Sequence, residues 1–117
     1  MTLANTSFEK IVSIRDAQSA YFRSGRTLDV KFRKEMLKRL HSAMEAWEAR
    51  ICDALWTDLH KSYEEAYLTE ISIVKAEIRT HLRHIDRWAS RHKVHTPLKL
   101  FPSRSYIVKE PLGNALI

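Results

Sequence analysis

Apolar side chains recur at intervals of three and four residues over about the first ninety positions, the spacing that places them on one face of an α-helix. The first such segment runs from about Phe8 to Phe22, and Asn5, Thr6 or Ser7 can cap its start. It is expected to end at Ser24-Gly25, because glycine readily adopts the positive φ of a helix terminus.

Two further amphipathic segments follow. Thr27 and Asp29 can cap the second, which fits either one long helix or two helices with a break near Ala46 or Trp47. Residues 58–64 contain no strong helix breaker, yet they must supply the bend before the third segment. The apolar positions are Leu37, Leu40, Met44, Trp47, Ile51, Leu55 and Leu59 in the second segment, and Tyr67, Ile71, Val74, Ile78, Leu82, Ile85 and Trp88 in the third.

The three tryptophans differ in their relation to these faces. Trp47 and Trp88 belong to the apolar positions and are expected in the core. Trp56 lies beside Leu55 at the edge of its face, and we expect it to be partly exposed.

The pattern changes after Trp88. Pro97 and Pro102 forbid a continued helix, and the apolar residues between and after them suit extended chain. These residues are Leu98, Leu100, Phe101, Tyr106, Ile107 and Val108. An isolated two-stranded ribbon is marginal in water, so such an arm is expected to join a further sheet.

The predicted fold class is therefore mainly α. We expect a helical segment of three to four helices over residues 1–90, followed over residues 91–117 by a basic linker and an extended β arm.

Composition excludes several classes of site. Gly25 and Gly113 are the only glycines, so a glycine-rich phosphate-binding loop has no residues to form it. Cys52 is the only cysteine, which excludes an internal disulfide and a cysteine-based zinc site and favours a reducing compartment. Neither a signal peptide nor a membrane-spanning apolar stretch is recognisable, so we expect a cytoplasmic protein without membrane contact.

The net charge of +6 comes largely from the segment after the last helix. Residues 91–108 contain four formal positive charges and no carboxylate, whereas Lys and Arg elsewhere alternate with Glu and Asp at helical spacing. This distribution indicates a basic connecting segment rather than a nucleic-acid interface, which needs several clustered cations.

Candidate chemistry is sparse. Cys52 lies beside Asp53, which opposes thiolate formation, and no residue nearby is expected to lower the pKa of its thiol, so we predict a packing residue. A metal site could draw on one face of the third helix and the residues after it. The candidates are Glu77, His81, His84, His92 and His95. Such spacings arise readily on any polar helix face, so we predict no metal ligand here.

Three stretches resemble one family. "YFRSGRTLDVKFRKEMLKRL" (21–40), "DLHKSYEEAYLTEIS" (58–72) and "FPSRSYIVKEPLGNALI" (101–117) are similar to the N-terminal portion of aldehyde dehydrogenases, most closely the class 3 type. The resemblance covers practically the whole chain. It implies opening helices packed around a dinucleotide-binding domain, and a final segment that leads into the first strand of its Rossmann-like sheet. Asn114 and Ala115 depart from the β-branched residues that usually follow the glycine.

The resemblance also limits the function of this chain. The family uses a cysteine nucleophile, an asparagine, a glutamate and NAD or NADP, and all of these elements lie downstream of the matched region. The resemblance thus implies no catalytic, cofactor-binding or metal-binding residue here, and no cofactor bound by this chain alone. It implies one pocket residue, Tyr67, which matches a tyrosine near the substrate tunnel of class 3 relatives; the alternative is an aromatic that only packs.

Two hypotheses follow. The chain is either the N-terminal part of an NAD(P)-dependent aldehyde dehydrogenase, inactive alone, or a helical interaction module that pairs its C-terminal strand with a partner sheet. Under the first hypothesis its partner is the remainder of the fold, in an enzyme that can form homo-oligomers. The resemblance favours the first.

Overall fold

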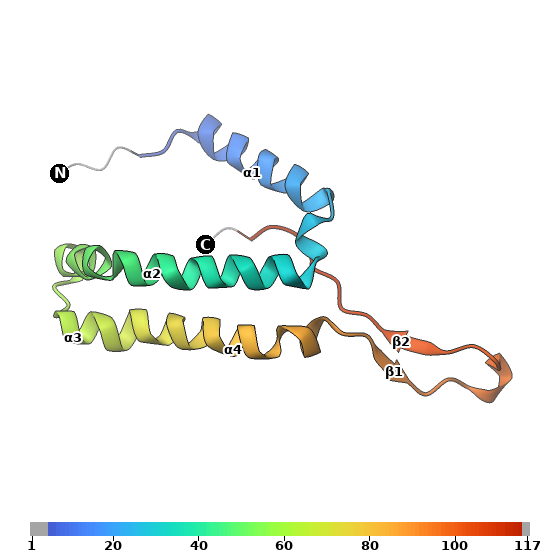
Figure 1. Cartoon of the computed structure of the whole chain (residues 1–117). Coiled ribbons are helices and arrows are strands. Elements are labelled where there is room, and N and C mark those ends of the chain that lie inside the picture. Colours follow the sequence, from blue (N-terminus) through green and yellow to red (C-terminus); the bar gives the residue numbers. More distant parts are fainter. Residues whose placement is uncertain (1–4, 116–117) are drawn as a thin grey trace.

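The computed structural model describes residues 5–115. The α-helices are α1 (Phe8–Arg23), α2 (Val30–Leu59), α3 (Tyr63–Ala66) and α4 (Ser72–Ala89), and the strands are β1 (His92–Val94) and β2 (Ser105–Ile107) (Figure 1). Two 3₁₀ turns, Arg26–Leu28 and Leu98–Leu100, and a π-helical segment, Tyr67–Ile71, lie between them. The predicted mainly α fold with a short β arm is confirmed.

Side-chain caps set the helix starts. The Ser7 hydroxyl accepts a hydrogen bond from the Lys10 amide at the start of α1, and the Asp29 carboxylate accepts from the Lys31 amide at the start of α2. These bonds satisfy amide groups that have no partner within the helix. Gly25 follows α1 with φ of 76°, a conformation that glycine adopts without strain. These expected boundaries are confirmed.

Helix α2 runs without a break for 30 residues, so the single long helix is the correct alternative. It ends where His60 adopts a left-handed conformation and its amide donates to the Trp56 carbonyl. The Ser62 hydroxyl then caps α3, which begins four positions before the expected Tyr67. The bend thus lies within residues 58–64, as predicted, and a non-glycine residue in the left-handed region forms it.

Helices α2 and α4 lie side by side and antiparallel (Figure 1), and the core lies between them. Ile71, Ile78 and Ile85 are buried at intervals of seven residues, which keeps them on the face toward α2. Cys52 and Ala66 are buried with Ile71, and four partly buried residues pack against them. Those residues are Met44, Ile51, Leu55 and Tyr67.

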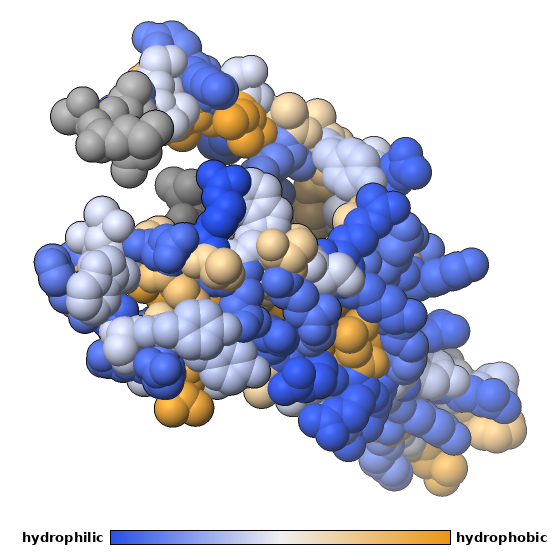
Figure 2. All heavy atoms as spheres, turned by 60° about the vertical axis from the view of Figure 1, so that its left-hand side comes forward, coloured by the Kyte–Doolittle hydropathy of each residue, from blue (hydrophilic) through white to orange (hydrophobic). Residues whose placement is uncertain are grey.

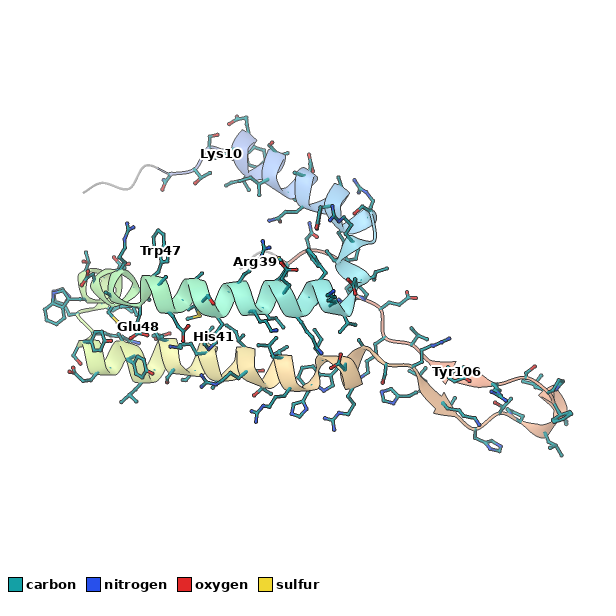
Figure 3. All side chains as sticks on the ribbon, viewed as in Figure 1. Lys10, Arg39, His41, Trp47, Glu48 and Tyr106 are labelled. Atoms are coloured by element: carbon teal, nitrogen blue, oxygen red, sulfur yellow. The ribbon has the colours of Figure 1, made fainter. Side chains whose placement is uncertain are left out.

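The prediction of a core position for Trp47 is wrong. Its side chain is 52% exposed and lies on the side of α2 away from α4 (Figure 3), where the Arg50 guanidinium stacks on its ring. The apolar face of α2 is wider than the surface that α4 covers. Trp56 is exposed, more than expected, and Trp88 is only partly buried, with its ring against His81.

The β arm differs from its prediction in detail. Strand β1 begins at His92, in the segment expected to be a linker, and pairs antiparallel with β2 so that Lys93 faces Tyr106. Leu98–Leu100 forms a 3₁₀ turn instead of extended chain, because it lies in the loop between the two strands. Leu98 and Phe101 remain exposed in this loop.

The chain is elongated. Its extents are 68 × 37 × 21 Å, and its radius of gyration is 20.2 Å, against about 13 Å for a compact chain of this length. Its accessible surface of 10192 Å² exceeds the roughly 6,600 Å² of a compact monomer of this mass. Helix α1 lies apart from α2 except near its end, where the rings of Tyr21 and Phe32 are 6.1 Å apart.

Candidate functional site

The predicted pocket residue Tyr67 lies at the closed end of the α2–α4 hairpin, as the first residue of the π-helical segment. Its ring is partly buried against the cluster of Cys52, Ala66 and Ile71. The Tyr63 ring stacks on it with centroids 6.5 Å apart and planes inclined by 13°. Among residues 5–115 no hydrogen bond is made by the Tyr67 hydroxyl, so this donor is available to a ligand.

A polar cluster surrounds this aromatic pair. The Tyr63 hydroxyl donates to Glu48 Oε1 at 2.7 Å. Lys75 Nζ lies 3.6 Å from Glu48 Oε2 and 3.6 Å from Glu45 Oε1, and its side chain is only 12% exposed. We call Glu45, Glu48, Tyr63, Tyr67 and Lys75 the Glu48 cluster. Figure 3 shows Glu48 extending from α2 toward α4.

Helical spacing assembles the cluster from α2, α3, the π-helical segment and α4. Glu45 and Glu48 are three residues apart on α2, and Tyr63 and Tyr67 are four apart, so each pair shares a helix face. The bend at His60 brings the two faces together. Sequence reasoning missed Glu48, Tyr63 and Lys75 as possible site residues. In the sequence, two glutamates three residues apart and a later lysine among apolar positions are only a weak indication of a site. They can be recognised as one cluster only when the pairing of α2 with α4 is known.

The hydrogen bond to Glu48 is the main cause that raises the pKa of Tyr63 to about 12, with burial and the Glu48 charge adding to it. Because the folded-state pKa of Tyr63 lies above the unfolded one, the stability that this hydrogen bond gives the fold is fully present below the unfolded pKa. It is lost as pH rises through the folded pKa.

We predict that Glu48→Gln lowers the pKa of Tyr63 toward its ordinary value. An ultraviolet titration of tyrosinate, with Tyr63→Phe to assign the late step, measures this. An unchanged late step in Glu48→Gln would contradict it.

Cys52 lies near this cluster but is poorly suited to nucleophilic chemistry. Burial, then the charges of Glu48 and Asp53, raise the pKa of its thiol. A nucleophilic cysteine needs the opposite shift and access to its substrate. The absence of a catalytic role for Cys52 stays a prediction, for which its burial and raised pKa are physical support.

The histidine candidates are spread over two parts of the fold. His81 Nδ1 lies 3.3 Å from Glu77 Oε1, and the His84 ring packs near Trp88. His92 belongs to β1 and His95 follows that strand. Within residues 5–115 no three His, Cys, Asp or Glu side chains are placed to hold a metal ion together.

A cleft of about 760 Å³ separates the end of α1 from the C-terminal tail. Asn114 Nδ2 donates to Ser19 Oγ across it at 3.3 Å. Its lining combines aromatic and small residues with Arg33: Ala17, Gln18, Tyr21, Phe22, Thr27, Arg33, Pro111, Gly113, Asn114 and Ala115. Figure 2 shows α1 as a separate lobe above the body of the molecule, with apolar patches among charged surface.

The tail does not form a strand up to Ala115, and the remaining part of the expected strand, Leu116 and Ile117, lies outside the described residues. Neither glycine lies at a strand-to-helix turn: Gly25 follows α1, and Gly113 lies in the tail. The described residues therefore do not fit a dinucleotide-binding loop. None of the helices within residues 5–115 combines the length and the apolar composition that a transmembrane span requires.

Known proteins match the chain both in sequence and in structure, although no family model matches it. It is 46% identical over 98 residues to a 4,4'-diaponeurosporen-aldehyde dehydrogenase of Staphylococcus aureus, a match that covers 84% of this chain and 21% of the relative. It is 37% identical over 112 residues to the mouse aldehyde dehydrogenase family 3 member B1, covering 95% of this chain and 23% of the relative.

A solved structure agrees with these relatives. The substrate-bound state of S. aureus AldH superposes with a TM-score of 0.79 at 41% identity, over 92% of this chain and 23% of that one. The chain is similar to the N-terminal part of aldehyde dehydrogenases, class 3 members among them. It spans about a fifth of the length of the aldehyde dehydrogenases it matches. The helical hairpin, α1 and the β arm thus match an N-terminal helical segment of an aldehyde dehydrogenase fold.

Proposed function

We propose that the chain serves as the N-terminal part of an NAD(P)-dependent aldehyde dehydrogenase, which oxidises aldehydes to carboxylic acids. The observation that carries the proposal is the structural match to S. aureus AldH over 92% of this chain at 41% identity. In this proposal the protein is cytoplasmic, the NAD or NADP is held by the remainder of the fold, and Tyr67 lines the substrate pocket.

The surface of the chain supports such a framework role. Phe8, Ile11 and Ile14 on α1 are exposed, as are Leu40 and Trp47 on α2. Exposed apolar groups on two neighbouring helices are typical of a surface that another part of a protein covers. The remainder of the aldehyde dehydrogenase fold is the partner proposed here, and the full enzyme can form homo-oligomers; nucleic acid and membranes are not partners in this proposal.

A chimera tests the proposal. We expect that S. aureus AldH keeps aldehyde oxidation within about tenfold of its parent when this chain replaces its N-terminal segment, because the two segments superpose and are 41% identical in sequence. The measurement is NADH or NADPH formation with an aldehyde substrate. The 117-residue chain alone is expected to give no turnover, since it supplies neither the nucleophile nor the cofactor site. A folded but inactive chimera, or turnover by the isolated chain, would contradict the proposal.

The alternative, an interaction module, is favoured by one observation. Ile107 and Val108 are exposed at the end of β2, at the base of the β arm, and a further strand could pair with this edge. Binding of a β-strand peptide to the isolated chain, and loss of that binding in the Ile107→Pro variant, would support the interaction module. An active chimera would instead support the role as an enzyme segment.

A further inference from the structure

We propose that Glu48 and Tyr63 are positioning residues that fix the ring of Tyr67 and thereby shape the substrate pocket. The inference rests on the proposed function, in which Tyr67 lines that pocket. It adds two residues that do not need to touch the substrate themselves.

The Glu48 carboxylate is held from both sides. Its Oε1 accepts the Tyr63 hydroxyl at 2.7 Å, and its Oε2 faces the Lys75 ammonium at 3.6 Å. Lys75 is mostly buried and also faces Glu45, so its own position is restricted. Glu48 on α2 is therefore linked to both α3 and α4, and Tyr63 has a fixed anchor for its phenol. Hydrogen bonds to an ionised group are stronger than those between neutral groups.

The Tyr63 ring transmits this restraint to Tyr67. The two rings are nearly parallel, with planes inclined by 13° and centroids 6.5 Å apart, as in an offset stack. Ala66, which is fully buried, precedes Tyr67 and fixes its backbone against Cys52. One face of the Tyr67 ring is thus supported by Tyr63, and movement of Tyr63 would release it.

The π-helical segment explains why the Tyr67 ring needs support from Tyr63. Residues Tyr67–Ile71 follow i to i+5 hydrogen bonding, which changes the direction of side chains relative to a regular α-helix and is common at functional sites. Tyr67 is the first residue of this irregular segment, so helical periodicity alone does not fix its ring. Its hydroxyl has no partner among residues 5–115 and can donate to an oxygen of the bound aldehyde, while the ring packs against an apolar chain.

Two variants test the donor and the acceptor of the Tyr63–Glu48 hydrogen bond separately. Tyr63→Phe keeps an aromatic ring at this position but removes the hydroxyl that anchors it, and Glu48→Gln removes the charge of the acceptor. Glu64→Gln is the matched control, because Glu64 is exposed and its side chain has no ion pair within the described residues. The first readout is nuclear Overhauser contacts between the Tyr63 and Tyr67 rings in the 117-residue chain, and the second is the kinetics of the chimera.

We expect both variants to weaken the ring-to-ring contacts and to raise KM for the aldehyde about three- to tenfold, with kcat within about twofold, as loss of one hydrogen bond implies. Glu64→Gln should change neither. Unchanged ring contacts in both variants would overturn the inference, and so would an unchanged KM in an active chimera whose ring contacts have weakened. An inactive parent chimera would instead count against the proposed function, while the ring contacts still decide whether Glu48 and Tyr63 position Tyr67.

Discussion

Replacement of Ile78 by aspartate is expected to unfold the α2–α4 hairpin. Ile78 is 4% exposed, between Ile71 and Ile85 on the face of α4 that packs against α2. The substitution removes buried methyl groups and takes a carboxylate out of water into the contact between α4 and α2. We expect a loss of about 4 kcal/mol or more in the free energy of unfolding, a large part of the stability of a small domain. Circular dichroism during urea denaturation measures it.

Ile73→Asp is the matched control on the same helix. Ile73 is 58% exposed, so the identical chemical change leaves its carboxylate in water and should alter the free energy of unfolding by less than about 0.5 kcal/mol. Equal stabilities of the two variants would show that α4 does not pack against α2 through Ile78. In the chimera, Ile78→Asp should abolish activity because the framework helices no longer assemble.

The boundaries of the elements were largely predictable from local chemistry. Ser7, Gly25 and Asp29 act within one turn of their own backbone, so the neighbouring sequence is enough to predict where the helices begin and end. The bend near His60 was placed correctly for another reason: it had to lie between the second and the third apolar segments, although no glycine or proline marks it.

Which residues form the core was less predictable. The apolar face of α2 includes both Ile51, which packs against α3, and Trp47, which is exposed on the other side. Periodicity identifies an apolar face but not how much of it a neighbouring helix covers. Cys52 was expected to pack but lies off the predicted apolar positions, and Ala66 was not predicted at all, because both are small; yet small residues are buried where the helices approach most closely.

The candidate site was predicted only at Tyr67, and only through the family resemblance. Glu48 and Lys75 are 27 positions apart in the sequence, and each alone is typical of a solvated helix face. Their partnership depends on the antiparallel register of α2 and α4, which no local pattern determines. Contacts between polar residues on different helices therefore cannot be predicted until the pairing of the helices is known.

Ala66→Leu is expected to give the second large loss of stability. Ala66 has 0% exposure and packs with Cys52 and Ile71 where α3 meets α2. Three added carbon atoms have no space there, so α3 must shift or the side chains must leave their preferred rotamers. We expect a loss of about 1–3 kcal/mol in the free energy of unfolding, measured by urea denaturation. Ala76→Leu on the exposed face of α4 is the control and should change stability little.

A double variant identifies the cause of this loss. If the leucine collides with the tightly packed α2 surface, removing the neighbouring sulfur by Cys52→Ala should return part of the lost stability in the Ala66→Leu background. The same Cys52→Ala change alone should destabilise the chain, since it leaves a small cavity. The two effects therefore have opposite signs in the two backgrounds. Simple additivity of the two substitutions would place Ala66 away from Cys52 and contradict the close packing of α3 on α2.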